Sequence, residues 1–430
     1  MSPENQSALF FALGMLVLMG VGMPMAMALV LTGAGMAWLL SFWDTQLIAQ
    51  NLVAGIDSFL LLAVPFFILA GEIMNAGGIS RRIIDMAQAW VGHFHGGLGY
   101  VVIGAAMVMG AISGSALADT AALATILLPM MRERGYPVAL SGGLIASGGI
   151  IAPMLPPSMA MIIFGVTTNT SISALFVAGI LPGLAMGLGL VLAWRFVLRQ
   201  HDLPVGKPAS FAERLLATRR AVWAILMPVL IIGGMKAGVF TATEAAVVAV
   251  FYALLIGLFV HREVKWVQLY PVFKRAAQTT AVVMFLCAGA QVCSYMIALA
   301  DLPTTLSQWL GSLTQSPRML VAVMMIALVV IGTALDLTPT ILILAPVMLP
   351  IAVKAGVDPV YFGVMFILNG AIGLITPPVG TVLNVVAGVG RISMHQVIKG
   401  VNPFLMIYLL ILVIFIIFPQ LITIPAHWLR

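Results

Sequence analysis

The chain has 430 residues, of which 62% are hydrophobic and 8% charged, and its 20 Lys and Arg residues exceed its 14 Asp and Glu residues. Because a soluble chain carries about a quarter charged residues, this composition disfavours soluble enzymes, nucleic-acid-binding proteins and disordered scaffolds. It predicts an all-α protein that crosses a membrane several times. The basic balance says little about partners, because Lys and Arg gather in the cytoplasmic loops of membrane proteins in general.

Apolar windows of about 20 residues, the length of helix that crosses the hydrocarbon core, recur along the chain. No Lys or Arg precedes the first window, so we expect a retained span rather than a cleaved signal. Several windows are too short to span alone. The expected segments are 8–40 broken near Pro24, 47–76 around Pro65, 98–117, 119–131, 138–170 broken at Pro153 to Pro157, 172–195, 221–240, 242–260, 276–300, 319–335, 338–353, 360–390 broken at Pro377-Pro378, and 401–424.

Two polar stretches, 195–220 and 261–275, hold ten of the 20 basic residues. The positive-inside bias places both in the cytoplasm, with 221–240 and 242–260 as an out-and-back helix pair between them. We therefore divide the chain into residues 1–200, a cytoplasmic loop with a central helix pair (201–260), and residues 261–430; the repeats and hairpins expected in the outer two parts rest on the duplication and the resemblance given below.

An internal duplication relates the two halves at one fixed spacing, that between Leu128 and Leu349. No gap is needed over the matched stretch. An unbroken register of Gly and Pro is hard to obtain by chance. The matches are Leu128-Pro129 with Leu349-Pro350, Gly135 with Gly356, Gly142 with Gly363, Gly149 with Gly370, and Pro156-Pro157 with Pro377-Pro378.

The duplicated segments GGIIAPMLPP and GAIGLITPP predict helix breaks in the middle of the membrane. Proline removes a backbone donor and glycine weakens a helix. Irregular backbone survives at that depth only where it is buried in protein or lines an aqueous cavity. Breaks repeated in both halves point to a transporter's binding site. The alternative, that Gly and Pro only kink long helices, is less favoured because the breaks are duplicated beside polar residues.

Oxygen-bearing side chains accompany both breaks, and each copy carries one acid near its first break, Asp119 or Asp336. An ionised acid in a membrane is costly unless it is paired or hydrated, and a bound Na+ would neutralise it. The alternative role for each acid is capping a neighbouring half-helix. The candidate oxygens for Na+ are Ser113, Ser115, Asp119 and Ser147 in the first copy, and Thr333, Asp336, Thr338, Asn369 and Thr376 in the second.

With these motifs, the sequence resembles the large membrane subunit (DctM-like) of tripartite ATP-independent periplasmic (TRAP) transporters. The resemblance covers nearly the whole chain. It rests on MGVGMPMAMALVLTG, AVPFFILAGEIMNAGGISRRI, GSALADTAALATILLPMMRERGYP, GGIIAPMLPPSMAMIIFG, TATEAAVVAVFYAL and NGAIGLITPPVGTVLNVVAG.

The resemblance implies two inverted repeats with re-entrant hairpins and broken helices, an elevator-type architecture of the ion-transporter superfamily. It implies Na+-driven uptake of an organic anion, such as a C4-dicarboxylate, a sialic acid or a sugar acid, across the bacterial inner membrane. The implied partners are a small four-helix membrane subunit, here a separate chain, and a periplasmic binding protein. No organic cofactor and no enzymatic activity are expected.

The resemblance also implies site residues. One sodium site would be shaped by 113–119 and 147–157, and the other by 332–338 and 369–378, with Gly149, Gly332 and Gly370 contributing main-chain oxygen. The substrate would lie between the hairpin tips and the proline pairs, and it is not fixed by the sequence. Arg391 or half-helix N-termini are candidates to face its carboxylate. The implied substrate-binding residues are Pro156, Pro157, Ser158, Pro377, Pro378 and Thr381.

Three other classes of protein fit the sequence less well. An ATP-driven pump lacks the phosphate-binding motif G-x-x-x-x-G-K-[ST]. An intramembrane aspartyl protease would use Asp119 and Asp336 as a dyad, but gives the proline pairs no role. A stand-alone anion channel or permease would use similar broken helices and stays open as an alternative.

Overall fold

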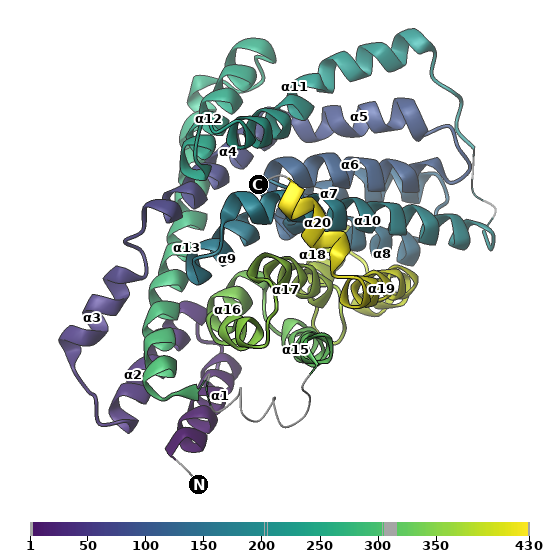
Figure 1. Cartoon of the computed structure of the whole chain (residues 1–430). Helices are drawn as coiled ribbons and strands as arrows, with labels where there is room; N and C mark the ends of the chain where they lie inside the picture. The colour runs from purple at the N-terminus through teal and green to yellow at the C-terminus, as the bar shows by residue number, and fades with distance from the viewer. Residues whose placement is uncertain (1–2, 202, 204, 303, 305–315, 429–430) are drawn as a thin grey trace.

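The computed structural model describes residues 3–201, 203, 205–302, 304 and 316–428, and these residues form helices joined by short turns (Figure 1). In chain order the elements are α1 (Pro3–Gly20), α2 (Met25–Leu39), α3 (Thr45–Ala54), η1 (Phe59–Leu62), α4 (Ala63–Ala76), α5 (Ile79–Val91), α6 (Gly97–Ser113), α7 (Ala116–Glu133), α8 (Val138–Gly149), η2 (Ala152–Met154), α9 (Met159–Thr168), α10 (Ile172–Leu198), α11 (Phe211–Lys236), α12 (Ala242–Leu255), η3 (Ile256–Val260), α13 (Trp266–Leu299), α15 (Pro317–Gly332), α16 (Leu337–Lys354), α17 (Pro359–Gly373), α18 (Thr381–Gly390), α19 (Met394–Ile417) and α20 (Gln420–Trp428).

The prediction of a multi-span membrane protein is confirmed. Seven helices of the described residues are long and apolar enough to cross a membrane, and an eighth span is formed if α8 and α9, bent by 43° at the first break, are taken together. Segment 47–76, which was predicted without a break, is interrupted at Gly55 to Ser58. Pro65 instead lies in the first turn of α4, where a helix has no use for the missing N–H. The amphipathic helix α5 lies between predicted segments and was not predicted.

The helix bounds confirm the duplication. When the first half is shifted so that Leu128 meets Leu349, the bounds of α7 coincide with those of α16, and α8 begins at the same position as α17. The correspondence continues outward from α6 and α15 to α10 and α19. It also extends toward the N-terminus, because α2 matches α12 with η3, and α3 to α4 match the long helix α13. The helices expected as the central pair thus hold the positions in the second repeat that α1 and α2 hold in the first.

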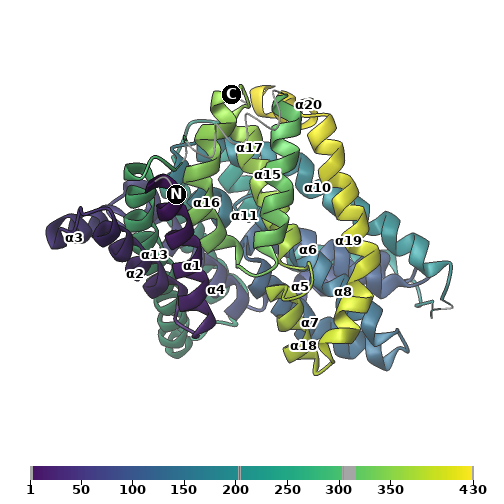
Figure 2. The ribbon, with the colours of Figure 1, turned by 90° about the horizontal axis from the view of Figure 1, so that it is seen from below.

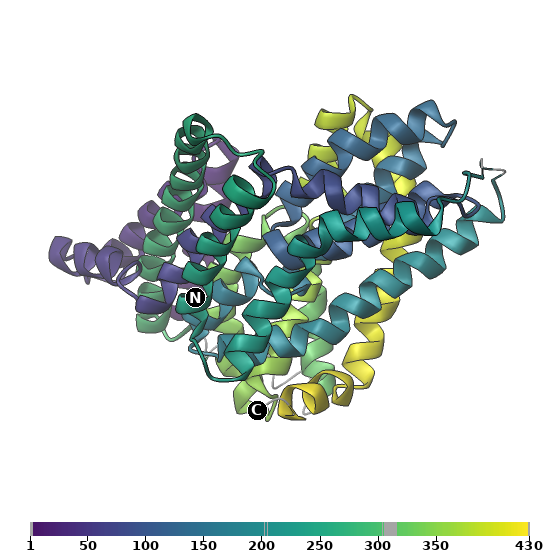
Figure 3. The ribbon, with the colours of Figure 1, turned by 90° about the horizontal axis from the view of Figure 1, so that it is seen from above.

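The two repeats are inverted, as their equivalent helices α10 and α19 show. Near the end of α10, Trp194 stacks on Phe404 in the first half of α19, with ring centroids 6.5 Å apart. Earlier in α10, Gly189 lies against Ile407 and Ile411, further along α19. Residue numbers therefore rise along one helix as they fall along the other, so the helices are antiparallel where they cross (Figure 3).

The repeats exchange packing partners with each other. Helix α2 of the first repeat packs on α13 of the second, and α12 of the second packs on α4 of the first. Likewise α7 packs on α18 and α9 on α16. Figure 1 shows α1 to α4, α12 and α13 gathered on one side of the molecule, and Figure 2 shows α5 to α8, α15 and α17 to α19 on the other. The helix breaks lie in this second group.

Candidate functional site at the helix breaks

Both predicted breaks interrupt their helices in the structure. Helix α8 ends at Gly149 and α9 begins at Met159, while α17 ends at Gly373 and α18 begins at Thr381. Each irregular segment contains a proline pair joined by a cis peptide bond, Pro156-Pro157 and Pro377-Pro378. The first segment is buried throughout, whereas Pro378 in the second is exposed. The broken backbone therefore meets protein on all sides in one repeat and is partly open in the other.

The tip of the first hairpin, between α6 and α7, lies against the first break. Gly114 turns the chain with φ +61°, and a Cβ atom built there would lie 2.6 Å from the main-chain oxygen of Pro157. Only glycine meets both demands, because it has no Cβ and adopts positive φ freely. Ser115 then caps α7 by accepting a hydrogen bond from the N–H of Ala118 at 3.4 Å. The predicted residues 113–119 and the proline pair are thus brought together.

Asp119 lies in the first turn of α7 with 1% of its surface exposed. The hydroxyl of Ser113 donates to its Oδ1 at 2.6 Å. Its Oδ2 atom and the hydroxyl of the next residue, Thr120, are buried with no hydrogen-bond partner among the described residues. Buried polar groups are normally satisfied, and an unpartnered carboxylate oxygen is among the costliest exceptions. The pair forms an oxygen-rich position suited to a cation.

The end of α8 closes this position from the other side. A Cβ atom at Gly149 would lie 1.8 Å from the Thr120 hydroxyl and 3.2 Å from the main-chain oxygen of Ala116. The hydroxyl of Ser147 donates back to Gly143 O at 2.8 Å, as serine often does within a helix. The structure therefore packs the predicted residue Gly149 against Thr120, the residue that follows Asp119 in the chain. Thr120 was not among the predicted residues.

The second hairpin, between α15 and α16, meets the second break in a similar way. The N–H of Gly380 donates to Thr333 O at 3.2 Å, and a Cβ atom at Gly373 would lie 2.9 Å from the Cα atom of Gly332. The hydroxyls of Thr333 and Thr376 both donate to main-chain oxygens within their own helical turns. Hairpin tip and break thus contact each other in both repeats.

Asn369 supplies the buried polar side chain of the second repeat. It is fully buried, and its amide nitrogen donates to Met325 O on α15 at 2.6 Å. Its Oδ1 atom has no partner among the described residues, which adds a third unsatisfied oxygen to those of Asp119 and Thr120. The neighbouring Gly370 lies against the side chain of Leu337, the first residue of α16.

The two acids occupy different positions of the repeat. Asp336 is the N-cap residue of α16 and makes no side-chain capping bond; its counterpart in the first repeat is Ser115, the N-cap of α7. Asp119 corresponds instead to Thr340, whose hydroxyl donates to Asp336 O at 2.7 Å. Both ion pairs of the described residues, Arg82–Glu263 and Arg275–Glu72, lie elsewhere. Neither acid is therefore neutralised by a basic side chain in the part of the chain that the structure describes.

A small cavity joins the two repeats. It has a volume of about 60 Å³ and is lined by the tip of the first hairpin, the two ends of the first break and the start of α16. Ser115 and Asp336 are among the predicted residues that line it. The remaining lining residues are Gly114, Ala116, Leu117, Pro153, Met159, Ala160, Leu337, Thr338 and Leu374.

The six predicted substrate-binding residues are close in sequence to residues that line this cavity, but none of the six lines it. Ser158 is buried and donates to Pro153 O at 2.6 Å, and it accepts from the N–H of Met161, so it caps α9. Thr381 begins α18, and its hydroxyl is buried without a partner among the described residues. Arg391 is exposed at the end of α18. Met159 and Ala160, which follow the first proline pair and line the cavity, were missed because nothing in their side-chain chemistry marks them.

Comparison with known proteins identifies relatives over the full length of the chain. The family model of the tripartite ATP-independent periplasmic transporter, DctM component, matches residues 12–421. The 2,3-diketo-L-gulonate TRAP transporter large permease protein YiaN of Escherichia coli is 51% identical over 95% of this chain and 96% of its own. The sialic acid TRAP transporter large permease protein SiaM of Vibrio cholerae is 38% identical over 95% of both chains.

A solved structure shares the fold. The YdaH transporter of Alcanivorax borkumensis, whose crystal structure shows an unusual topology, superposes with a TM-score of 0.61 over 97% of this chain and 98% of its own. Sequence identity in that comparison is 14%, so the likeness concerns the arrangement of helices alone.

Proposed function

Because the chain belongs to the DctM-component family of tripartite ATP-independent periplasmic transporters, we propose that it imports an organic carboxylate together with Na+. The observation that carries this proposal is the meeting of both hairpin tips and the first helix break at one cavity. In transporters built from inverted repeats, substrate and coupling ions bind where discontinuous helices from the two repeats meet.

We assign Na+ sites to two of the positions where a buried side-chain oxygen lacks a partner among the described residues. In the first repeat these oxygens belong to Asp119 and Thr120, with the main chain around Gly149 close by. In the second repeat the oxygen belongs to Asn369, next to Gly370. Na+ is a hard cation that prefers oxygen ligands, and its charge offsets the cost of a buried carboxylate. It is transported together with the substrate in each cycle.

The proposed substrate is an organic acid with hydroxyl groups. The names of the relatives YiaN and SiaM refer to 2,3-diketo-L-gulonate and to sialic acid, which both carry a carboxylate. The capping ends of α7, α9 and α16 converge on the cavity, and the N-terminus of a helix favours an anion. A cavity of about 60 Å³ holds about two water molecules. The hairpin tips must therefore separate to admit a sugar acid.

The opening of the hairpin tips admits the substrate, and a second motion, that of the proposed elevator mechanism, carries the site across the membrane. The group that holds the breaks moves against the group of α1 to α4, α12 and α13, so that one site opens first to one side of the membrane and then to the other. Both hairpin tips and both breaks lie in the same group, which allows the site to move as a unit. Alternating access by one bundle moving against another is common in folds with inverted repeats.

The proposed partners follow from the family. They are a small four-helix membrane subunit and a periplasmic protein that binds the substrate and delivers it. The proposed location is the inner membrane of a bacterium. These three assignments rest on the family name and on the relatives, which are described as permease proteins of tripartite transporters.

The decisive experiment is uptake into liposomes that contain the chain and its membrane subunit. A panel of radiolabelled acids, including 2,3-diketo-L-gulonate, a sialic acid and a C4-dicarboxylate, is supplied with the binding protein and with an inward Na+ gradient or an equal K+ gradient. We expect saturable uptake of one acid only when Na+ and the binding protein are both present. Flux that needs neither would indicate a channel and refute the proposal.

A further inference from the structure

A basic groove lies on the cytoplasmic side of the protein, away from the helix breaks. Its volume is about 1110 Å³, and it is lined by the start of α5, the first third of α11 and the turn after η3. Four arginines and two acids line it: Arg81, Arg82, Arg219, Arg220, Asp85 and Glu263. The positive-inside bias assigns the stretches at 195–220 and 261–275 to the cytoplasm, which places this groove on that side.

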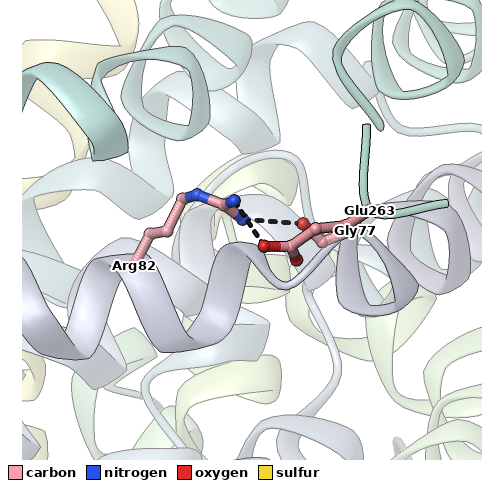
Figure 4. A network of polar contacts seen from close by, with 3 residues as sticks. All are labelled: Gly77, Arg82 and Glu263. Carbon is pink, nitrogen blue, oxygen red and sulfur yellow. Dashed lines mark hydrogen bonds and ion pairs between the residues drawn. The ribbon is translucent and has the colours of Figure 1, made fainter. Parts of the chain in front are cut away.

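One of the four arginines, Arg82, is already bound by other groups of the protein. Arg82 forms an ion pair with Glu263 and donates to Gly77 O at 2.9 Å (Figure 4). Glu263 reaches this position because Gly78 has no side chain: a Cβ atom there would lie 1.9 Å from a Glu263 oxygen. The other three arginines make no hydrogen bond or ion pair among the described residues. Among the lining residues that the structure describes, one acid, Asp85, is not in an ion pair. Three unpaired arginines and one unpaired acid give the groove a net positive charge.

The groove is held open by contacts between α5 and α11. The indole N–H of Trp90 on α5 donates to the Thr218 hydroxyl on α11 at 2.9 Å. The guanidinium carbon of Arg214 lies 5.8 Å from the centre of the Trp90 ring. Figure 1 shows α5 and α11 running side by side. These contacts hold α5 and α11 next to each other, so that the arginines of both helices line one groove.

The groove is at the level of the membrane interface. The apolar side chains of α5, Ile79, Ile83, Ile84 and Ala87, are buried, while Arg81 and Asp85 are exposed. Exposed charged side chains such as these lie outside the hydrocarbon core, at or beyond the headgroups. The lining also includes Trp223, which is 36% exposed, and tryptophan gathers at headgroup level.

An apolar surface continues from the charged part of the groove. Leu216 and Val260 line the groove and are 49% and 41% exposed. Beyond Arg220 the α11 sequence turns apolar and enters the membrane. His261 contributes little charge at neutral pH, because burial and the nearby Arg82 lower the pKa of its imidazole, although Glu263 acts in the opposite direction. The arginines therefore define the anion-binding character of the groove.

From this arrangement we infer that the groove between α5 and α11 binds an anionic phospholipid of the cytoplasmic leaflet. Arg81, Arg219 and Arg220 bind the phosphate of the headgroup, and the acyl chains lie along Leu216 and Val260. Basic pockets between membrane helices on the cytoplasmic side are a recurrent way to hold such headgroups. The bound lipid links the interfacial helix α5 to α11. This inference does not depend on the transported substrate.

The test measures lipid retention on the full-length chain purified in detergent. Native mass spectrometry is recorded after addition of phosphatidylglycerol or of phosphatidylcholine with the same acyl chains. The double variant Arg219→Gln/Arg220→Gln is compared with Arg132→Gln/Arg134→Gln, which removes the same charge from two exposed arginines at the C-terminal end of α7. Arg81→Gln removes one charge from the opposite wall of the groove and serves as an independent variant.

We expect the chain to retain phosphatidylglycerol in preference to phosphatidylcholine. The Arg219→Gln/Arg220→Gln variant should retain at least about 10-fold less phosphatidylglycerol, and the Arg81→Gln variant about 5-fold less. The reason is that each basic residue near an anionic headgroup strengthens binding by about 5-fold. The control variant should retain the lipid. Equal retention of both lipids, or equal loss in the control, overturns the inference. So does thermal stabilisation by inorganic phosphate alone at the level seen with phosphatidylglycerol, which would indicate a site for a soluble anion.

Discussion

The hydroxyl of Tyr408 on α19 donates to the main-chain oxygen of Ser147 on α8 at a distance of 2.7 Å. Tyr408 is fully buried. Two residues after Ser147 the helix ends, and the N–H of Ile151 bonds to Gly148 O. The tyrosine therefore satisfies a carbonyl group near the end of α8 that the break would leave unpaired, and it fixes the half-helix beside the proposed Na+ site to the second repeat.

The Tyr408→Phe variant removes this hydrogen bond and little else. We expect a stability loss of about 1 kcal/mol and a several-fold higher Na+ concentration for half-maximal uptake, because the end of α8 is no longer fixed. Tyr361→Phe is the matched control, since the Tyr361 hydroxyl donates to Phe415 O at 3.0 Å away from the first break. It should lose similar stability in a thermal unfolding assay and keep its Na+ dependence. An equal effect of both variants on Na+ dependence would contradict the assignment.

The Asp119→Asn variant tests the first Na+ site directly. We expect the Na+ concentration for half-maximal uptake to rise about 10-fold or more, because a neutral amide no longer offsets the charge of the ion. The control is Asp358→Asn, at the N-cap of α17, where the carboxylate accepts from the N–H groups of Val360 and Tyr361. Asparagine caps helices as well as aspartate, so this control should behave as the unmodified chain. The measurement is initial uptake rate against Na+ concentration.

The contact between Gly114 and Pro157 predicts a sharp difference between two glycine substitutions. Gly114→Ala and Gly135→Ala both force alanine into positive φ, at +61° and +78°, which costs about 1 kcal/mol in each case. Only at Gly114 does the new methyl group also meet backbone atoms of the first break. We expect Gly114→Ala to reduce uptake at least 10-fold and Gly135→Ala to keep it near normal at equal membrane expression. Equal activity of the two variants would show that the hairpin tip does not need this close approach.

Crosslinking tests the meeting of the two repeats at the small cavity. In a background with Cys287→Ala and Cys293→Ala, we expect Leu117→Cys and Thr338→Cys to be joined by a short bifunctional thiol reagent, because both positions line the same cavity. The pair Leu117→Cys and Lys354→Cys is the control, since Lys354 is at the far end of α16, about 24 Å along the helix axis from Thr338. Crosslinking is read as a mobility shift on a gel. Equal crosslinking yields for the two cysteine pairs would contradict the meeting of the two hairpin tips at the cavity.

The sequence predicted the helix breaks and the repeat because glycine and proline mark them, whereas the hairpins were expected from the family resemblance. Glycine and proline punctuate a membrane helix wherever they occur, and the same punctuation returns in the second half in the same register. The polar residues near the breaks were also visible, since few polar residues are found in apolar segments. What the sequence did not show is which polar group is left without a partner. Thr120 was overlooked because only the packing of Gly149 against it reveals its position.

The helix starts outside the apolar segments were predicted less well. Helix α11 begins at Phe211, well before its predicted start at 221, although Ser210 and Glu213 form a capping box that hydropathy alone ignores. The interfacial helix α5 is too polar to register as a span, and only its periodicity indicates a helix. The cavity forms where residues from opposite halves of the sequence, such as Ser115 and Asp336, line one space. No local pattern indicates that they do so.

The exchange of packing partners between the repeats affects biogenesis. The face of α2 that receives α13 is shaped to it, because Gly33 lies against Val292 and Gly289 lies against the main chain of Ala26. During synthesis the face of α2 that packs on α13 therefore stays uncovered in the bilayer until α13 has been synthesised and inserted. Two polypeptides divided between residues 201 and 209 should accordingly be degraded when made singly and persist when made in the same cell.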